Sequence, residues 1–457
     1  MKLDYRQYER KLLALALPII MNNIIAQLQM IIDRIFLGHA NDLYMSALGN
    51  VSSPVWTTMS FCNSLVMGAS ILISQSVGAE KREDIGEYAG AMMKYNNIIP
   101  VLLCFFWMFF PKPVFMMLGV SDSVMPLCLS YVRWYAPLFL LTGLGGSLGV
   151  ILQTSNYTKP LVVYGLVRSG LNIFLDWMLI FGKFRMPALG IEGAAIATVI
   201  AEYVGAIYIS VIFFTSKKLP TRPSWTEVKN GHLRSYLHSA KLGINIALED
   251  FAWNIGNLIL IRILNSINEY AAGIYTIVFG VEVLAVVIIG AIGSGTMTLT
   301  SEATGSRDFM QYRGITICAY GICVIVTGLM IVGAVLFPEQ ILSLFTSDQA
   351  VIASSGIYLL LIGINLFAKS GNIIIGNAIR GSGNTRWMLY TQIFGTIWIV
   401  SVASVFVFVC KLGILGVFLA VMVDEGVRAL INLWKYIRII KKWGSYESIC
   451  LYIKRIV

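Results

Sequence analysis

Apolar runs long enough to cross a membrane alternate with short polar segments along the whole chain. A transmembrane helix needs about 20 consecutive apolar residues, so each of these runs is read as one span. The longest polar stretch, residues 216–239, divides the runs into two equal groups. The pattern therefore predicts twelve membrane-spanning helices, at 13–38, 50–77, 92–117, 124–148, 161–182, 190–215, 240–265, 271–300, 314–337, 350–375, 388–410 and 413–437.

Composition supports a membrane protein and excludes an ordinary soluble one. Apolar residues make up 57% of the chain and charged residues 13%, whereas soluble domains average about 45–50% and 25%. The net charge of +10 lies in short loops, which argues against a nucleic-acid partner and for contact with membrane lipid. We expect an all-α integral membrane fold, with twelve transmembrane helices in two six-helix lobes.

Lysine and arginine indicate the orientation of the chain in the membrane. Most of them fall in alternate connections, the ones that face the cytoplasm if the amino terminus does. The positive-inside rule then places both termini in the cytoplasm of a multi-pass protein of the cell inner (plasma) membrane. The predicted organisation is an amino-terminal lobe at 1–215, a cytoplasmic linker at 216–239, a carboxy-terminal lobe at 240–440 and a cytoplasmic tail at 441–457.

Internal repeats relate the two halves. Residues 189–202 realign with residues 412–425, and residues 68–79 with residues 295–306. Because each half has an even number of spans, both copies enter the membrane from the same side. Their pseudo-twofold axis is therefore expected to run along the membrane normal, with a substrate path between the lobes.

Several classes of function lack their motifs. The sequence has no GxxxxGK[ST] phosphate-binding loop, no HExxH metalloprotease motif and no aspartate-rich DDxxD site. Its seven cysteines form no CxxC pair and sit mostly among apolar residues, which indicates packing rather than metal binding. We therefore expect neither an enzyme nor an ATP-driven pump, and no cofactor. Transport must then draw on an ion gradient or on the substrate's own gradient, and a duplicated carrier fits better than a channel.

Polar residues inside the predicted spans of the first half form one cluster of candidates. Asp33 lies on the first span, Arg168, Asn172 and Asp176 follow one stripe of the fifth, and Thr198 lies on the sixth. Charged groups inside a bilayer need a partner, a cavity or a function. Two carboxylates, an amide and a hydroxyl offer hard oxygen ligands for Na⁺, and two close carboxylates equally suit a proton. A purely structural polar network is the alternative.

The second half carries its own charged candidates. Glu249 and Asp250 lie on the seventh span, Glu282 on the eighth and Lys369 on the tenth, and we assign all four to the substrate cavity. Lys369 is expected to pair with Glu249, Asp250 or Glu282 and so balance the charge of this lobe. On the twelfth span, residues 424–428 have the spacing of an intrahelical ion pair.

Five short motifs together resemble a known family. They are Leu15-Ala-Leu-Pro-Ile19, Asp33-Arg-Ile-Phe-Leu-Gly38, Gly68-Ala-Ser-Ile-Leu-Ile-Ser-Gln-Ser-Val-Gly78, Leu171-Asn-Ile-Phe-Leu-Asp176 and Gly190-Ile-Glu-Gly-Ala-Ala-Ile-Ala-Thr198. Their order and spacing over essentially the whole chain resemble the multidrug and toxic compound extrusion (MATE) family. The closest resemblance in motif is to its DNA-damage-inducible F and archaeal-type branch. The resemblance implies two six-helix lobes around a central cavity, and efflux driven by inward H⁺ or Na⁺.

The resemblance also assigns roles to residues. It matches Asp33, Asn172, Asp176 and Thr198 to the amino-lobe cation site of that branch, and places Glu249 where many members carry a glutamate. Lys369 departs from the vibrio-type Na⁺ exporters, which have an acidic residue at about this position. A carboxy-lobe Na⁺ site of that type is therefore not expected.

The predicted function is secondary active antiport. The chain is expected to export organic, cationic or amphiphilic compounds by alternating access, in exchange for H⁺ or Na⁺, and to act as a monomer. The alternative is a flippase for lipid-linked oligosaccharides or precursors in the same superfamily. Such a protein needs a basic cavity to hold a pyrophosphate, and the balanced acids and bases of these spans do not favour it.

Overall fold

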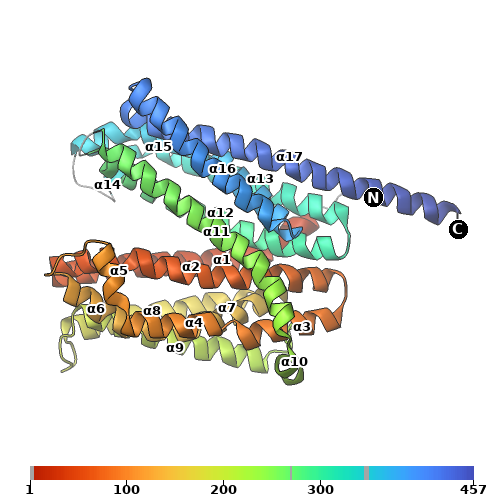
Figure 1. The fold of residues 1–457 in the computed structure, drawn as a ribbon, viewed down its shortest axis with the longest axis horizontal. Coiled ribbons are helices and arrows are strands. Elements are labelled where there is room, and N and C mark those ends of the chain that lie inside the picture. Colours follow the sequence, from red (N-terminus) through yellow and green to blue (C-terminus); the bar gives the residue numbers. More distant parts are fainter. Residues whose placement is uncertain (1–4, 268–269, 344–348, 457) are drawn as a thin grey trace. The chain divides into compact units, whose positions relative to one another are not determined.

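The computed structural model describes residues 5–267, 270–343 and 349–456, and within them the chain is helical apart from short connections (Figure 1). The side chains at 42, 349–351, 353, 354 and 444–456 lie outside this description. An all-helical fold satisfies every backbone hydrogen bond within its own segment, as a membrane interior requires.

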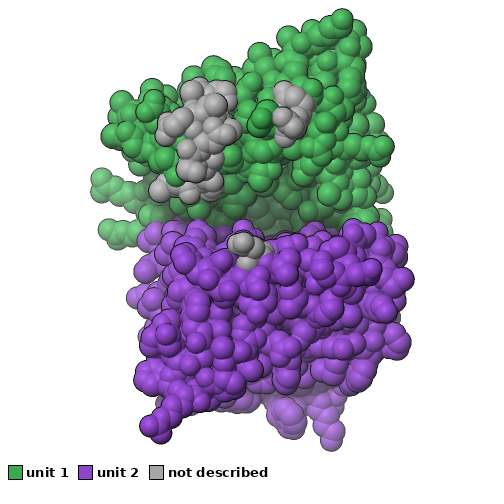
Figure 2. Space-filling model, turned by 90° about the vertical axis from the view of Figure 1, so that its left-hand side faces the viewer, with its two compact units in different colours: residues 1–16, 78–80, 248–457 green, residues 17–77, 81–247 purple. Residues whose placement is uncertain are grey.

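The chain packs as two compact units, coloured separately in Figure 2. Unit 1 comprises residues 1–16, 78–80 and 248–457, and unit 2 comprises residues 17–77 and 81–247. Both α1 and α11 contribute to the two units, because one unit boundary falls inside each of these helices. Each unit is described on its own below.

Unit 2 contains most of the first half of the chain. Its helices are the second part of α1 (Tyr5–Ala40), nearly all of α2 (Asp42–Gly78), α3 (Arg82–Tyr95), α4 (Ile98–Phe109), α5 (Pro111–Met117), α6 (Met125–Tyr135), the 3₁₀ turn η1 (Ala136–Leu138), α7 (Phe139–Thr154), α8 (Lys159–Phe181), α9 (Ile191–Thr215), α10 (Trp225–Asn230) and the first part of α11 (Leu233–Asn265).

Unit 1 contains the remaining helices. They are the start of α1, the second part of α11, α12 (Ala271–Gly305), α13 (Phe309–Leu336), α14 (Pro338–Ser343), α15 (Gln349–Gly381), α16 (Thr385–Ser404), the π-helical turn η2 (Val405–Val409) and α17 (Gly413–Ile456). Helix α15 packs against both α12 and α17, and these three helices carry Glu282, Lys369 and Arg428 among their charged residues.

Twelve long helical segments among the described residues correspond to the twelve predicted spans. Ten of them are long and apolar enough to cross a membrane. The other two, α11 and α17, are also long, but each carries several charged residues. The prediction of an all-helical membrane fold is confirmed. The largest error in the predicted spans is at the end of the twelfth, set at 437, because α17 continues to Ile456. The tenth span, set to end at 375, likewise continues as α15 to Gly381.

Local sequence explains where individual helices end. Pro111 and Pro160 lie in the first turns of α5 and α8, where a missing N–H costs nothing. Gly182 ends α8 in a left-handed conformation, with φ of 66°, which glycine adopts without strain. Asp308 caps α13 by accepting a hydrogen bond from the Gln311 backbone N–H at 2.8 Å.

Each unit has its own apolar core. In unit 2 one cluster gathers around Trp107, Phe115 and Phe139, all of them fully buried, between α2, α4, α6 and α9. In unit 1 another gathers around Phe418 and Leu264, between α11, α12 and α17. These cores hold the polar side chains of α1, α8, α12, α15 and α17 in place.

The two predicted lobes, the linker at 216–239 and the tail at 441–457 remain a prediction based on membrane topology. The packing units have different boundaries, since residues 5–16 pack with unit 1 and the segment 216–239 with unit 2. Helix α17 runs without interruption to Ile456, so the backbone of the predicted tail continues the last helix. The side chain of Cys450 lies outside the described residues. Five of the other cysteines are buried, as predicted, and Cys410 is exposed.

Candidate functional site

The polar residues predicted to form a cation site meet inside unit 2. Gln29 and Asp33 are one turn apart on α1, and Asn172 and Asp176 are one turn apart on α8. Asn172 and Asp176 are fully buried, and Gln29 is 9% exposed. A polar group buried this deeply is stable only with a partner, so their mutual contacts matter.

Asn172 is the residue that joins the cluster. When its amide is turned so that the nitrogen faces the acids, that nitrogen lies 3.0 Å from Asp33 Oδ1 and 3.3 Å from Asp176 Oδ2. The amide oxygen then lies 3.3 Å from both the backbone nitrogen and the hydroxyl of Thr198 on α9. This orientation follows from the hydrogen-bonding partners, as amide orientations generally must. All four predicted residues are therefore in one contact group.

The two carboxyl groups also contact each other. The Asp33 and Asp176 side chains are within hydrogen-bonding reach, and Asp33 further accepts from Gln29. Gln29 is held in turn by the Ser169 hydroxyl, which donates to its Oε1 at 2.7 Å. Two carboxylates in contact repel each other unless a proton or a cation lies between them. Asp176 Oδ1 is buried and lacks a hydrogen-bonding partner among the described residues, so it has a free lone pair.

The orientation of Asn172 bears on the chemistry of the cluster. Its N–H groups face the carboxylates, whereas Na⁺ coordination would use its oxygen. The remaining oxygen donors are the two carboxylates and the Thr198 hydroxyl, which donates to the Ala194 carbonyl at 2.9 Å. The donor set is hard and anionic and can take either a proton or Na⁺, and the amide orientation fits a proton more directly.

Glu202 belongs to a separate pair. Its Oε2 lies 3.4 Å from Arg168 Nη1, and its Oε1 accepts a hydrogen bond from the Tyr164 hydroxyl. The Arg168 side chain also lies over the Tyr164 ring, 5.4 Å from its centroid. Arg168 therefore neutralises Glu202, and the stripe of α8 divides into an ion pair at one end and the carboxyl cluster at the other.

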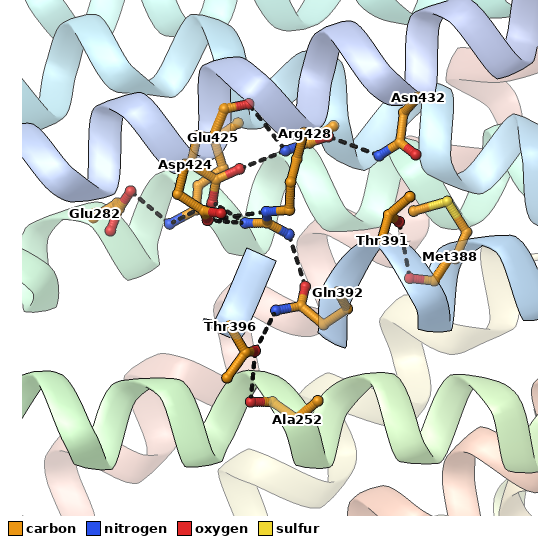
Figure 3. Close-up of polar contacts among 12 residues, drawn as sticks. Ala252, Glu282, Met388, Thr391, Gln392, Thr396, Asp424, Glu425, Arg428 and Asn432 are labelled. Carbon is orange, nitrogen blue, oxygen red and sulfur yellow. Dashed lines mark hydrogen bonds and ion pairs between the residues drawn. The ribbon is translucent and has the colours of Figure 1, made fainter. Parts of the chain in front are cut away.

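The charged residues of unit 1 form a denser network, drawn in Figure 3. Lys369 Nζ lies 2.7 Å from Glu282 Oε1 and 3.9 Å from Glu425 Oε1. Arg428 lies 2.9 Å from Asp424 Oδ2 and 3.0 Å from Glu425 Oε1, which are the intrahelical pairs expected from their spacing. Of the three acids predicted as partners of Lys369, the structure selects Glu282.

Glu249 and Asp250 lie elsewhere. Glu249 Oε1 accepts a hydrogen bond from Arg380 Nη2 at 2.6 Å, and Asp250 contributes to the electrostatic field at the same arginine. Arg380 reaches them because α15 extends to Gly381, beyond the predicted end of the span. Arg380 lies beyond residue 375, where the tenth span is predicted to end, so its pairing with Glu249 corrects that boundary.

A small cavity lies beside the network of unit 1. Its volume is about 30 Å³, and its lining includes Glu282, Lys369, Asp424 and Trp253. Of the four predicted substrate-cavity residues, Glu282 and Lys369 therefore line this cavity, and Glu249 and Asp250 are not among its lining residues. A space of this size holds a water molecule but no organic solute.

Some neighbours of the charged groups were missed in the sequence. They are amides and hydroxyls, whose single positions carry no distinctive pattern: Ser169 and Tyr164 in unit 2, and Asn372, Gln392 and Asn432 in unit 1. Spacing was the available signal for two of them. Ser169 lies one turn before Asn172, and Asn372 lies one turn after Lys369, on the same helices as the predicted residues.

An all-helical membrane fold with neutralised charges buried in both units is the architecture of a membrane transporter. The MatE family model matches residues 18–178 and 246–407, which is most of the chain. The chain therefore belongs to the MATE family, which consists of transporters rather than enzymes.

Individual relatives agree with this assignment. The chain is 27% identical over 448 residues to "Probable multidrug resistance protein NorM" of Thermotoga maritima, covering 94% of this chain and 93% of the relative. It is 24% identical to the "Uncharacterized transporter YisQ" of Bacillus subtilis, covering 87% and 88%. A solved structure of a MATE protein in complex with MaD3S superposes with a TM-score of 0.86 at 19% identity, covering 96% of this chain and 97% of the other. At that identity the superposition establishes the fold.

Proposed function

We propose that this protein is an antiporter that exports organic, cationic or amphiphilic compounds in exchange for H⁺ or Na⁺. The observation that carries the proposal is the contact between the Asp33 and Asp176 carboxyl groups through Asn172. A half-buried acid and a buried acid in contact change their interaction strongly when a cation binds or leaves. The multidrug resistance name of the Thermotoga relative supports an organic substrate.

The proposed coupling site consists of Asp33, Asn172, Asp176 and Thr198. It resembles the amino-lobe cation site of the DNA-damage-inducible F and archaeal-type branch. The ion is cargo that enters as the solute leaves, so the site must release it on the inner side. The distribution of lysine and arginine supports cytoplasmic termini. The protein is proposed to act as a monomer, with each unit holding its own set of buried charges.

Unit 1 supports an organic cation over a lipid-linked pyrophosphate. Lys369, Arg380 and Arg428 are each held within hydrogen-bonding distance of an acid. A basic side chain neutralised in this way does not offer its charge to an anionic substrate.

The test is export of a fluorescent organic cation from proteoliposomes, with a pH gradient or a Na⁺ gradient imposed separately. We expect uphill movement with one gradient, lost in Asp33→Asn and retained in Asp84→Asn, a matched change at an exposed acid. A channel would dissipate the gradient without accumulating solute. If neither gradient moves the cation and Asp33→Asn behaves as wild type, the proposal fails and lipid-linked substrates become the next to test.

A further inference from the structure

Asp424 of α17 uses only one of its two carboxylate oxygens. Its Oδ2 accepts a hydrogen bond from Arg428 Nε at 2.9 Å and lies 2.9 Å from Nη2 of the same guanidinium. Its Oδ1 is buried and has no hydrogen-bonding partner among the described residues, and the whole residue is 3% exposed. A buried carboxylate oxygen without a partner is costly, so a ligand for it is expected.

The neighbouring acids differ from Asp424 in this respect. Glu425 Oε2 accepts from Asn372 Nδ2 at 2.6 Å, and its Oε1 lies 3.0 Å from Arg428. Glu282 is held by Lys369 at 2.7 Å. Asp424 is thus the acid of this network that has both a buried free oxygen and a place on the cavity lining.

The charges around Asp424 leave one negative charge in excess. Helix α12 contributes Glu282, α15 contributes Lys369, and α17 itself contributes Asp424, Glu425 and Arg428. Helix α16 faces them with Gln392 and Gly395, and η2 packs on α17 through apolar residues. On α11, Glu249 is neutralised by Arg380. Helix α13 meets α17 at Tyr436, three turns beyond Asp424. Three acids therefore face two bases.

The surroundings of Oδ1 suit a proton. A Cβ atom added to Gly395 would lie 2.9 Å from Oδ1, so the glycine of α16 leaves room at this oxygen. The adjacent cavity of about 30 Å³ accommodates a water molecule. A metal cation needs several oxygen ligands, whereas a proton needs a single lone pair.

We infer that Asp424 Oδ1 is a second, reversible proton-binding position, located in unit 1 and separate from the coupling site of unit 2. The proton comes from water in the cavity and adds to Oδ1, which converts the carboxylate into a neutral carboxylic acid and makes the network electrically neutral. Oδ2 keeps its hydrogen bonds from Arg428 in both states. The inference holds whichever ion drives export.

Infrared pH-difference spectra of the full-length protein in lipid test the inference. The carbonyl stretch of a protonated carboxylic acid identifies the group, and the Asp33→Asn/Asp176→Asn variant removes the two coupling-site acids of unit 2 from the spectrum. In that background, which lacks the two acids of the coupling site, we expect a band that grows as the pH falls and disappears when Asp424→Asn is added. The same band must persist when Asp84→Asn is added instead. A spectrum that Asp424→Asn leaves unchanged would overturn the inference.

Two further measurements keep the test decisive. Adding Na⁺ at constant pH should leave the band in place, and its displacement by Na⁺ would contradict a proton-only position. If Asp424→Asn does not fold, Gly395→Ala places a methyl group against Arg428 Cδ and 2.9 Å from Asp424 Oδ1. This displaces the Asp424–Arg428 pair and should shift the band, and no shift would count against the inference. The band is measured in a variant that already lacks the proposed coupling site. Its presence or absence therefore does not depend on whether the transport proposal is right.

Discussion

The ion pair between Lys369 and Glu282 is a close and deeply buried electrostatic contact of unit 1. Its atoms are 2.7 Å apart, and the exposed fractions of the two side chains are 11% and 1%. Changing Lys369→Met leaves Glu282 buried without its cation, while Glu425 keeps Arg428 and Asn372. Removing one partner of a buried pair costs about 3–5 kcal/mol, so we expect a loss of that order in the free energy of unfolding.

The matched double variant isolates the pair. Replacing both charges, as Lys369→Met with Glu282→Met, removes the uncompensated acid and keeps apolar volume, so its stability should return to within about 1.5 kcal/mol of wild type. Denaturant titration in detergent micelles, followed by tryptophan fluorescence, measures the free energies of unfolding of wild type, of each single variant and of the double variant. Lys183→Met, at an exposed loop position, serves as the control and should change little. A single variant as stable as wild type, or losses that simply add in the double variant, would refute the reasoning.

Two further predictions concern unit 2. A Cβ at Gly205 would lie 2.8 Å from Tyr164 Cε2. Gly205→Ala should therefore lower the free energy of unfolding by about 1–3 kcal/mol through crowding. The control Gly170→Ala, where a Cβ meets open space, should be neutral in the same denaturant titration. Burial raises the pKa of Glu227, but the hydrogen bonds from Ser224 and Arg82 together lower it by more, so the pKa of Glu227 lies below its ordinary value. The ionised Glu227 carboxylate therefore stabilises α10 at neutral pH, and this stabilisation is lost as the pH falls through the lowered pKa. Hydrogen exchange of residues 225–230 should be faster in Glu227→Gln than in wild type at neutral pH, and equal under acid conditions. A difference that grows with acidity would contradict this sign.

The helices could be predicted from the sequence because long apolar runs mark them directly. Their ends were harder, since a helix can continue past a charged residue when a partner neutralises it. Arg380 is the example: it resembles a loop residue in sequence, yet it lies inside α15 and pairs with Glu249.

The candidate sites were predictable residue by residue but not as contacts. Spacing places Asn172 and Asp176 on one face of α8, and it identifies Asp424, Glu425 and Arg428 as neighbours. Which acid holds Lys369 depends on how α12 and α15 pack, and no local pattern records that. The orientation of Asn172 likewise depends on Thr198 of a different helix.

The central claim is that the carboxyl cluster of unit 2 carries the coupling ion. Its most direct test is the entry of that ion into proteoliposomes preloaded with the organic solute, recorded with an ion-sensitive dye trapped inside, for wild type, Asp176→Asn and the control Asp84→Asn. The account predicts solute-dependent ion entry in wild type and in the control, and none in Asp176→Asn. Ion entry in Asp176→Asn equal to that of wild type would contradict the account and place the coupling elsewhere in the protein.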